Sequence, residues 1–180
     1  PRVVVAQGQA AFFQVDGVAL RGYDPVSYFD GEPRLGSGSI AHNHQGTSWR
    51  FATAENRDRF VADPARFLPQ YGGYCALGMA HGGAVPTDPL AYTVYRGKLY
   101  LNSSKLVRMT WSYARDWMIE RAAPNWRAWL ERQAVAVAGG TQPDRRPSPP
   151  DRDPNLAAGG LDVLSFFEPG GAQLGDSTIT

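Results

Sequence analysis

Three tight turns constrain this chain more than any other feature of its sequence. Each is a dipeptide ending in glycine that lies between two short runs rich in apolar residues. Such dipeptides favour two-residue hairpins because they tolerate positive φ, and three hairpins indicate a small antiparallel sheet. The predicted hairpins cover residues 11–22, 39–52 and 91–102, and they turn at Asp16-Gly17, Gln45-Gly46 and Arg96-Gly97.

Helical patterns fill the segments between and after these hairpins. The strongest covers residues 103–122, where an apolar stripe at i, i+3 and i+4 spacing is expected to pack against the sheet. Pro124 is expected to end this helix, because an interior proline removes a hydrogen bond, and a last helix follows it. This order of elements predicts an α+β fold, a small antiparallel sheet of hairpins packed against several helices. The stripe consists of Leu106, Met109, Tyr113 and Trp117.

Composition changes sharply toward the end of the chain. Residues 1–9 form a short N-terminal segment, and residues 10–138 hold the periodic patterns of one domain. Residues 139–160 are rich in proline, glycine and charge without periodicity, which is typical of a linker. Hydrophobic residues make up 43% of the chain, enough for one ordinary globular core.

The last segment, residues 161–180, echoes residues 22–40. GLDVLSFFEPGGAQLGDSTI follows GYDPVSYFDGEPRLGSGSI if two residues are inserted in the loop, so that Asp162 matches Asp24 and Ser165 matches Ser27. The echo predicts a partial second copy of the domain or a docking tail. Chance similarity of short, turn-rich segments is the alternative.

Charge and hydropathy limit the partners of this chain. Lys plus Arg total 18 against 17 for Asp plus Glu, which gives a net charge of +1. A strong field of one sign, which nucleic-acid binding requires, is therefore missing, and no nucleic-acid partner is expected. The chain shown holds no apolar stretch of about 18 residues, so no transmembrane segment is expected.

The ordered motifs of the chain resemble the YHS-domain family over residues 15–129. They are VDGVALRGYDPVSYFDG, WRFATAENRDRFVADPARF, PQYGGYCA, GKLYLN and a late NW. In the metal-binding branch of that family, cysteines in D-P-V-C and F-C-S-x-x-C-x-x-x-F gather a soft or borderline metal ion. The matching positions here are Ser27, Ala52 and Asn56, so the three ligand cysteines are missing. The chain is similar instead to the branch of typically exported bacterial proteins, which implies an α+β fold and a periplasmic location.

The segment QYGGYCALGMAHGG, residues 70–83, holds the one cysteine of the chain. If residues 71–80 are helical, Cys75 and Met79 lie one turn apart and offer two sulfur ligands to copper or another soft transition-metal ion, with His81 near the helix end. A buried cysteine beside a core methionine explains the same spacing. A nucleophilic Cys75 with a histidine base is a third alternative, without an acidic partner at a recognisable spacing.

His42 and His44 form an H-x-H pattern on a predicted strand. Alternation points both imidazoles to one face, where they are a legitimate chelating pair for a divalent ion. Two ligands are few for such a site, and a polar edge of the second hairpin explains the pattern equally.

Two functions of different classes follow from the sequence. The first is a non-enzymatic accessory or interaction module of a larger periplasmic assembly, in which an apolar piece of the tail binds a protein partner. The second is a metal-binding module that uses Cys75. The pattern identifies no catalytic residue, so enzymatic activity is the least supported class. The partner-binding candidates in the tail are Val163, Leu164, Phe166 and Phe167.

Overall fold

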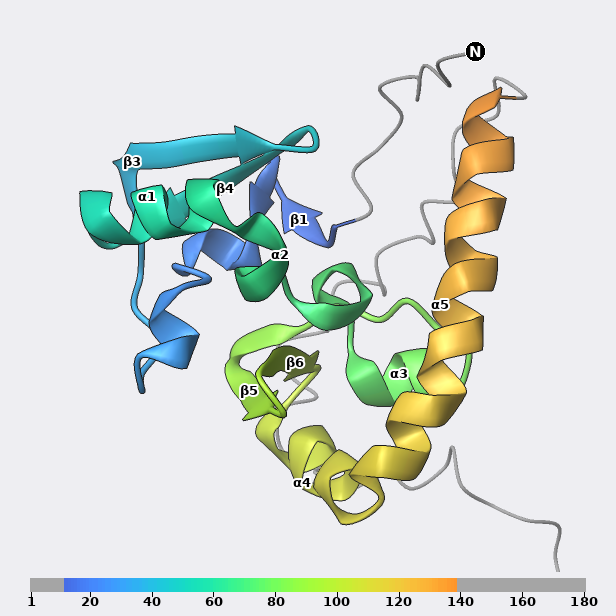
Figure 1. Cartoon of the computed structure of the whole chain (residues 1–180). Helices are drawn as coiled ribbons and strands as arrows, with labels where there is room; N and C mark the ends of the chain where they lie inside the picture. Colours follow the sequence, from blue (N-terminus) through green and yellow to red (C-terminus); the bar gives the residue numbers. More distant parts are fainter. Residues whose placement is uncertain (1–11, 139–180) are drawn as a thin grey trace, which may run out of the picture. The chain divides into compact units, whose positions relative to one another are not determined.

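The computed structural model describes residues 12–138, and these residues form an α+β fold, as predicted (Figure 1). The class follows from the sequence, because segments with hairpin signals alternate with segments of helical periodicity. The predicted N-terminal segment 1–9, the linker 139–160 and the partial repeat 161–180 lie outside the described residues.

All three predicted hairpins are present at the predicted turns. The first turn residues have positive φ, 52° at Asp16, 50° at Gln45 and 50° at Arg96, and each is followed by a glycine at positive φ. Two such residues in succession give a turn whose twist matches that of the flanking strands. The strands are β1 (Gln14–Val15) with β2 (Val18–Ala19), β3 (Ser37–His44) with β4 (Thr47–Phe51), and β5 (Asp88–Tyr95) with β6 (Lys98–Asn102).

The hairpins form two sheets in place of the single antiparallel sheet that we predicted. The first has the strand order β1-β2-β4-β3, and its inner pair β2–β4 is parallel. The second sheet is the β5–β6 hairpin. The domain has two hydrophobic clusters, and β6 contributes to both. Leu99 and Leu101 lie in the first cluster, and Tyr100, which points to the opposite face, lies in the second with Trp111. Strand β6 therefore lies between two hydrophobic clusters.

Capping side chains determine where three of the helices begin. Thr53, Asp63 and Ser104 each accept a hydrogen bond from the main-chain N–H three residues further on. Pro64 takes the first position after its cap, where its missing N–H costs nothing. The helices are α1 (Ala54–Ala62), α2 (Pro64–Phe67), α3 (Ala76–Ala80), α4 (Lys105–Tyr113) and α5 (Arg115–Ala138), and 3₁₀ turns cover Leu20–Gly22, Ser27–Phe29 and Gln70–Gly73.

The strongest predicted helix breaks at Ala114, and the predicted break at Pro124 is wrong. Ala114 has φ −128° and ψ 36°, outside the helical range, whereas α5 continues through Pro124. The proline removes one hydrogen bond from the helix. The preceding turns of α5, however, bury Met118 and Ala122 in the second hydrophobic cluster, and this packing holds the helix in place.

The predicted core position of the apolar stripe is also wrong, because its four side chains lie at the surface. Their exposed fractions are 57% for Leu106, 51% for Met109, 86% for Tyr113 and 49% for Trp117. The fully buried side chain of α4 is Trp111. It lies two positions from both Met109 and Tyr113, a rotation of about 200° that puts it on the opposite side of the helix.

We expect Pro124→Ala to stabilise the protein. Alanine restores the N–H that bonds the carbonyl of Glu120 and removes the ring from the preceding turn, for a gain of about 1–3 kcal/mol in the free energy of unfolding. Urea denaturation followed by far-UV circular dichroism measures this gain. Arg127→Ala, an exposed control on the same helix, should change the value by less than about 0.5 kcal/mol. A loss of stability in Pro124→Ala would contradict this account of α5.

Candidate functional site

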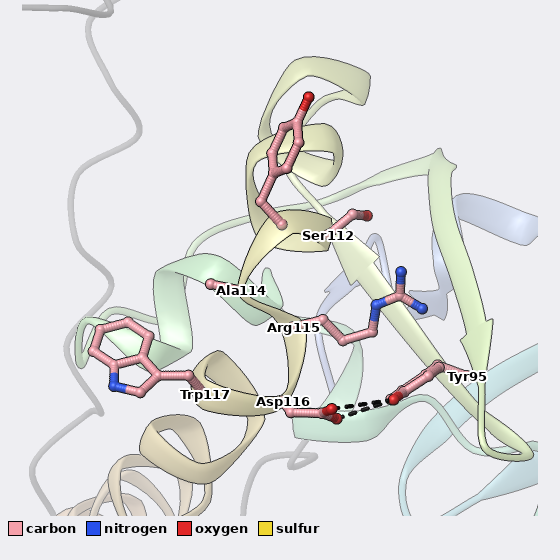
Figure 2. A pocket seen from close by; sticks show the side chains of 7 residues that line it. Tyr95, Ser112, Ala114, Arg115, Asp116 and Trp117 are labelled. Carbon is pink, nitrogen blue, oxygen red and sulfur yellow. Dashed lines mark hydrogen bonds between the residues drawn. The ribbon is translucent and has the colours of Figure 1, made fainter.

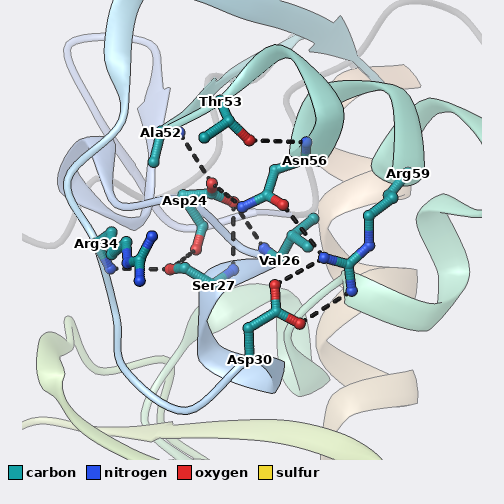
Figure 3. A network of polar contacts seen from close by, with 9 residues as sticks. All are labelled: Asp24, Val26, Ser27, Asp30, Arg34, Ala52, Thr53, Asn56 and Arg59. Atoms are coloured by element: carbon teal, nitrogen blue, oxygen red, sulfur yellow. Dashed lines mark hydrogen bonds and ion pairs between the residues drawn. The ribbon is translucent and has the colours of Figure 1, made fainter.

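The buried carboxylate of Asp24 joins the opening turn of the domain to the start of α1 (Figure 3). Its Oδ1 accepts a hydrogen bond from the Val26 N–H at 2.8 Å. Its Oδ2 accepts one from the Ala52 N–H at 2.9 Å and one from the Asn56 side-chain amide at 2.7 Å. A fully buried carboxylate requires such donors, since an unpaired charge in the interior is strongly destabilising.

Ser27 completes this Asp24 network from the other side. Its hydroxyl donates to the Asp24 carbonyl at 2.7 Å and accepts from the Arg34 N–H at 2.9 Å. Ser27, Ala52 and Asn56, where the sequence analysis compared ligand cysteines, all form hydrogen bonds with Asp24. The donors at these positions are bonded to protein oxygens, so the network is a structural link between segments.

A polar hollow of about 240 Å³ borders the same network. Arg59 forms a two-pronged ion pair with Asp30 at 2.7 and 3.0 Å. The hydrogen bond to Arg59 and the Arg59 charge hold the pKa of Asp30 below its usual value, although burial opposes this shift. Glu32, Glu55 and Arg34 also line the hollow, so opposite charges lie together and no ion of one sign is favoured.

Cys75 caps helix α3 and is buried, with an exposed fraction of 1%. Its Sγ accepts a hydrogen bond from the Gly78 N–H at 3.4 Å and donates to the Asn102 side-chain oxygen at 3.6 Å. The helix begins at Ala76 and not near residue 71 as predicted, because Tyr71 has φ 54° and Gly72 has φ 60°, both left-handed. The thiol is therefore part of a helix cap inside the protein.

Of the other predicted ligands, His81 lies away from Cys75 along α3. Met79 is fully buried in the second hydrophobic cluster, and His81 is exposed at the opposite end of α3 from Cys75. The five residues of α3 separate Cys75 from His81, and six steps along a helix rise about 9 Å. Within residues 12–138, no group of three or more His, Cys, Asp or Glu side chains lies close enough to hold a metal ion.

His42 and His44 share one face of β3, as predicted, and both contact the ring of Phe60. The ring centroids are 6.3 Å apart for His42 and 5.7 Å for His44. Burial, and secondly the charge of His42, lowers the pKa of His44, so its neutral form is favoured near neutral pH. The two imidazoles pack on α1 as partly buried side chains.

An exposed apolar surface lies on α4 and the start of α5, and we call it the α4–α5 stripe. It consists of the four exposed side chains described above, Leu106, Met109, Tyr113 and Trp117. The stripe includes a hollow of about 330 Å³ at the break between the helices, which Tyr113 and Trp117 line together with Tyr95 and Arg115 (Figure 2). Exposed large apolar side chains on neighbouring turns make this surface a candidate interaction site.

Polar contacts hold the borders of this hollow. The Tyr95 hydroxyl donates to Asp116 at 3.0 Å, and the guanidinium of Arg115 lies over the Tyr95 ring at 4.5 Å (Figure 2). The guanidinium of Arg121 lies over the Trp117 ring at 4.8 Å. The hollow is therefore lined by aromatic rings and by both a basic and an acidic side chain, Arg115 and Asp116.

The sequence pattern identified the residues of the stripe, but it predicted that they pack against the sheet, whereas they lie at the surface. One signal could have corrected this. Trp111 is the largest side chain of α4, and two apolar sets on opposite faces of one helix cannot both face the sheet. The predicted partner-binding residues Val163, Leu164, Phe166 and Phe167 lie outside the described residues.

No family model, no curated protein and no solved structure matches this chain. In the part of the chain that the structure describes, none of the helices has the length and apolar character to span a membrane.

Replacement of Asp24 by asparagine should destabilise the domain strongly. An amide at this position presents an N–H₂ group to donors that need an acceptor, so we expect the free energy of unfolding to fall by about 2–4 kcal/mol. Asp30→Asn removes only the exposed pair with Arg59 and should cost about 0.2–1 kcal/mol. Urea denaturation compares the two variants. Equal losses would contradict the central role of Asp24.

Cys75 should react with the thiol reagent DTNB only after the protein unfolds. Because the sulfur is a buried helix cap, Cys75→Ser keeps an acceptor for the Gly78 N–H and should stay within about 1 kcal/mol of wild type, whereas Cys75→Ala should lose about 1–2 kcal/mol. Absorbance after DTNB addition and urea denaturation measure the two effects. Fast labelling of the folded protein would show instead that the thiol is accessible and free to react.

Proposed function

We propose that this protein is a non-enzymatic interaction module that binds a protein partner through the α4–α5 stripe. The observation that supports this proposal is the exposure of four large apolar side chains on one pair of helices. A domain with two well-packed hydrophobic clusters has no need of these side chains for its own core. Their surface position is explained if a partner covers them.

The composition of the stripe fits a protein interface. Tyrosine, tryptophan and arginine are enriched at the centres of interfaces, where a few anchors supply most of the binding free energy. Tyr113, Trp117 and the neighbouring Arg115 and Arg121 are of these types. The hollow between the helices can receive one side chain of the partner, and the arginines at its border can pair with acidic groups beside it.

The family resemblance adds an expectation of location. Since the chain resembles the exported branch of YHS proteins, we propose the bacterial periplasm as its compartment and an accessory place in a larger assembly as its role. A metal-binding function through Cys75 draws no support from the positions of Met79 and His81.

Replacement of the two aromatic anchors tests the proposal. The protein and its Tyr113→Gln/Trp117→Gln variant are isolated from the native source without chelator and weighed by native mass spectrometry. We expect the wild-type chain in a complex of fixed stoichiometry and the variant at least about ten-fold depleted from it, because each anchor supplies about 2 kcal/mol. Both side chains are exposed, so the fold should be preserved.

Val61→Gln is the matched control for this experiment. Val61 is an exposed apolar side chain on α1, 47% accessible, and its replacement should leave the complex intact. A wild-type chain of bare mass, or equal recovery of the complex with both variants, would refute the stripe as the binding surface. A bound metal mass that Cys75→Ser abolishes would favour the metal-binding alternative.

A further inference from the structure

The break between α4 and α5 has no cause in the local sequence. It consists of one residue, Ala114, and alanine has the highest helix propensity of all residue types. Neither glycine nor proline, the usual causes of a sharp kink, occurs between Gly97 and Pro124. The break also leaves the last carbonyls of α4 and the first N–H groups of α5 without helical partners. Tertiary packing therefore imposes the break on a segment that favours one helix.

The two faces of these helices stay in phase across the break. At about 100° per residue, the core-facing side chains of α4 and α5 would fall within about 20° of Trp111 around one uninterrupted helix. The stripe would fall about 160–240° away, on the opposite side. A single helix over residues 105–138 would therefore have one core face and one stripe. The core-facing side chains are Trp111, Met118 and Ala122, which lie in the second cluster, and Trp129, which contacts Tyr74.

Helix α5 is held to α3 and the turn before it by contacts that a second copy of the chain can also supply. The side-chain amide of Asn125 donates to the carbonyls of Met79 and Ala80 at 2.9 and 3.1 Å. The ring of Trp129 lies 5.2 Å from that of Tyr74. If α5 leaves α3 of its own molecule, the same groups can form the same contacts with α3 of another.

We infer that the chain forms a domain-swapped dimer, in which residues 105–138 form one straight helix and α5 packs on α3 of a second copy. The exchange keeps the contacts of Asn125 and Trp129, and it adds the helical hydrogen bonds that the break at Ala114 removes. Association costs translational and rotational freedom, so the dimer is favoured at high protein concentration. The inference does not rest on the proposed function, because the α3–α5 contacts do not include the stripe.

Replacement of the residue at the break tests this inference. The wild-type chain is refolded from urea at high concentration and analysed by sedimentation velocity, where we expect a dimer in equilibrium with the monomer. Ala114→Gly disfavours the straight helix in both subunits and should raise the dimer dissociation constant at least about five-fold. Ala123→Gly is the matched control, since this exposed alanine is helical in both forms. It should leave the dissociation constant within about two-fold of wild type.

Subunit exchange distinguishes the swapped dimer from a dimer joined at its surface. Isotope-labelled and unlabelled dimers are mixed and followed by native mass spectrometry. Mixed dimers should form slowly, because α5 must first leave α3, which requires partial unfolding. Tyr113→Gln/Trp117→Gln should still dimerise, because the exchanged contacts do not involve these side chains.

Four results would overturn the inference. They are a wild-type chain that stays monomeric after refolding at high concentration, equal dissociation constants for Ala114→Gly and Ala123→Gly, mixed dimers complete within the mixing time, and loss of the dimer in Tyr113→Gln/Trp117→Gln. The last result would mean that two copies associate through the stripe. The complex with a different partner is measured separately, so the proposed function can stand or fall independently of the swap.

Discussion

The carboxylate of Asp24 is the interaction on which the arrangement of the N-terminal half depends. It connects three parts of the chain that are remote in sequence, the opening turn, the end of β4 and the first turn of α1. Burial removes water as a competitor, so each of its hydrogen bonds is strong, and the loss of one donor leaves a charge without compensation. The end of β4 and helix α1, two of the segments that Asp24 joins, also supply the aromatic core of this half, where Trp49 and Phe51 each contact Phe60.

The second half is organised around strand β6, which lies between two hydrophobic clusters. The alternation of its side chains sends Leu99 and Leu101 to one cluster and Tyr100 to the other. Tyr100 then contacts Trp111, and this contact orients α4. Asn125 donates to the carbonyls of Met79 and Ala80, which ties α5 to the end of α3.

The orientation of α4 has a functional consequence. Once Trp111 faces the second cluster, the stripe on the other side of the helix must face outward. The surface that we propose for partner binding is thus a product of core packing elsewhere in the domain. In the same way Ser27, Ala52 and Asn56 form hydrogen bonds with Asp24. Cys75 is explained by its role as the cap of α3. The side chains of the α4–α5 stripe, in contrast, are exposed and take no part in the two hydrophobic clusters.

Local features of this protein were determined by the sequence alone. The three hairpin turns and the caps at Asp63 and Ser104 depend on residues within a few positions of one another, so their physics is complete in a short segment. The sheet arrangement, the break at Ala114 and the exposure of the stripe depend on which face of each element meets a core, and several faces were compatible with the sequence. The Asp24 network joins residues 28 and 32 positions apart, a separation at which no local pattern identifies a partner. Only the tertiary structure decided these features, because burial and long-range hydrogen bonds select one packing among those that local preference allows.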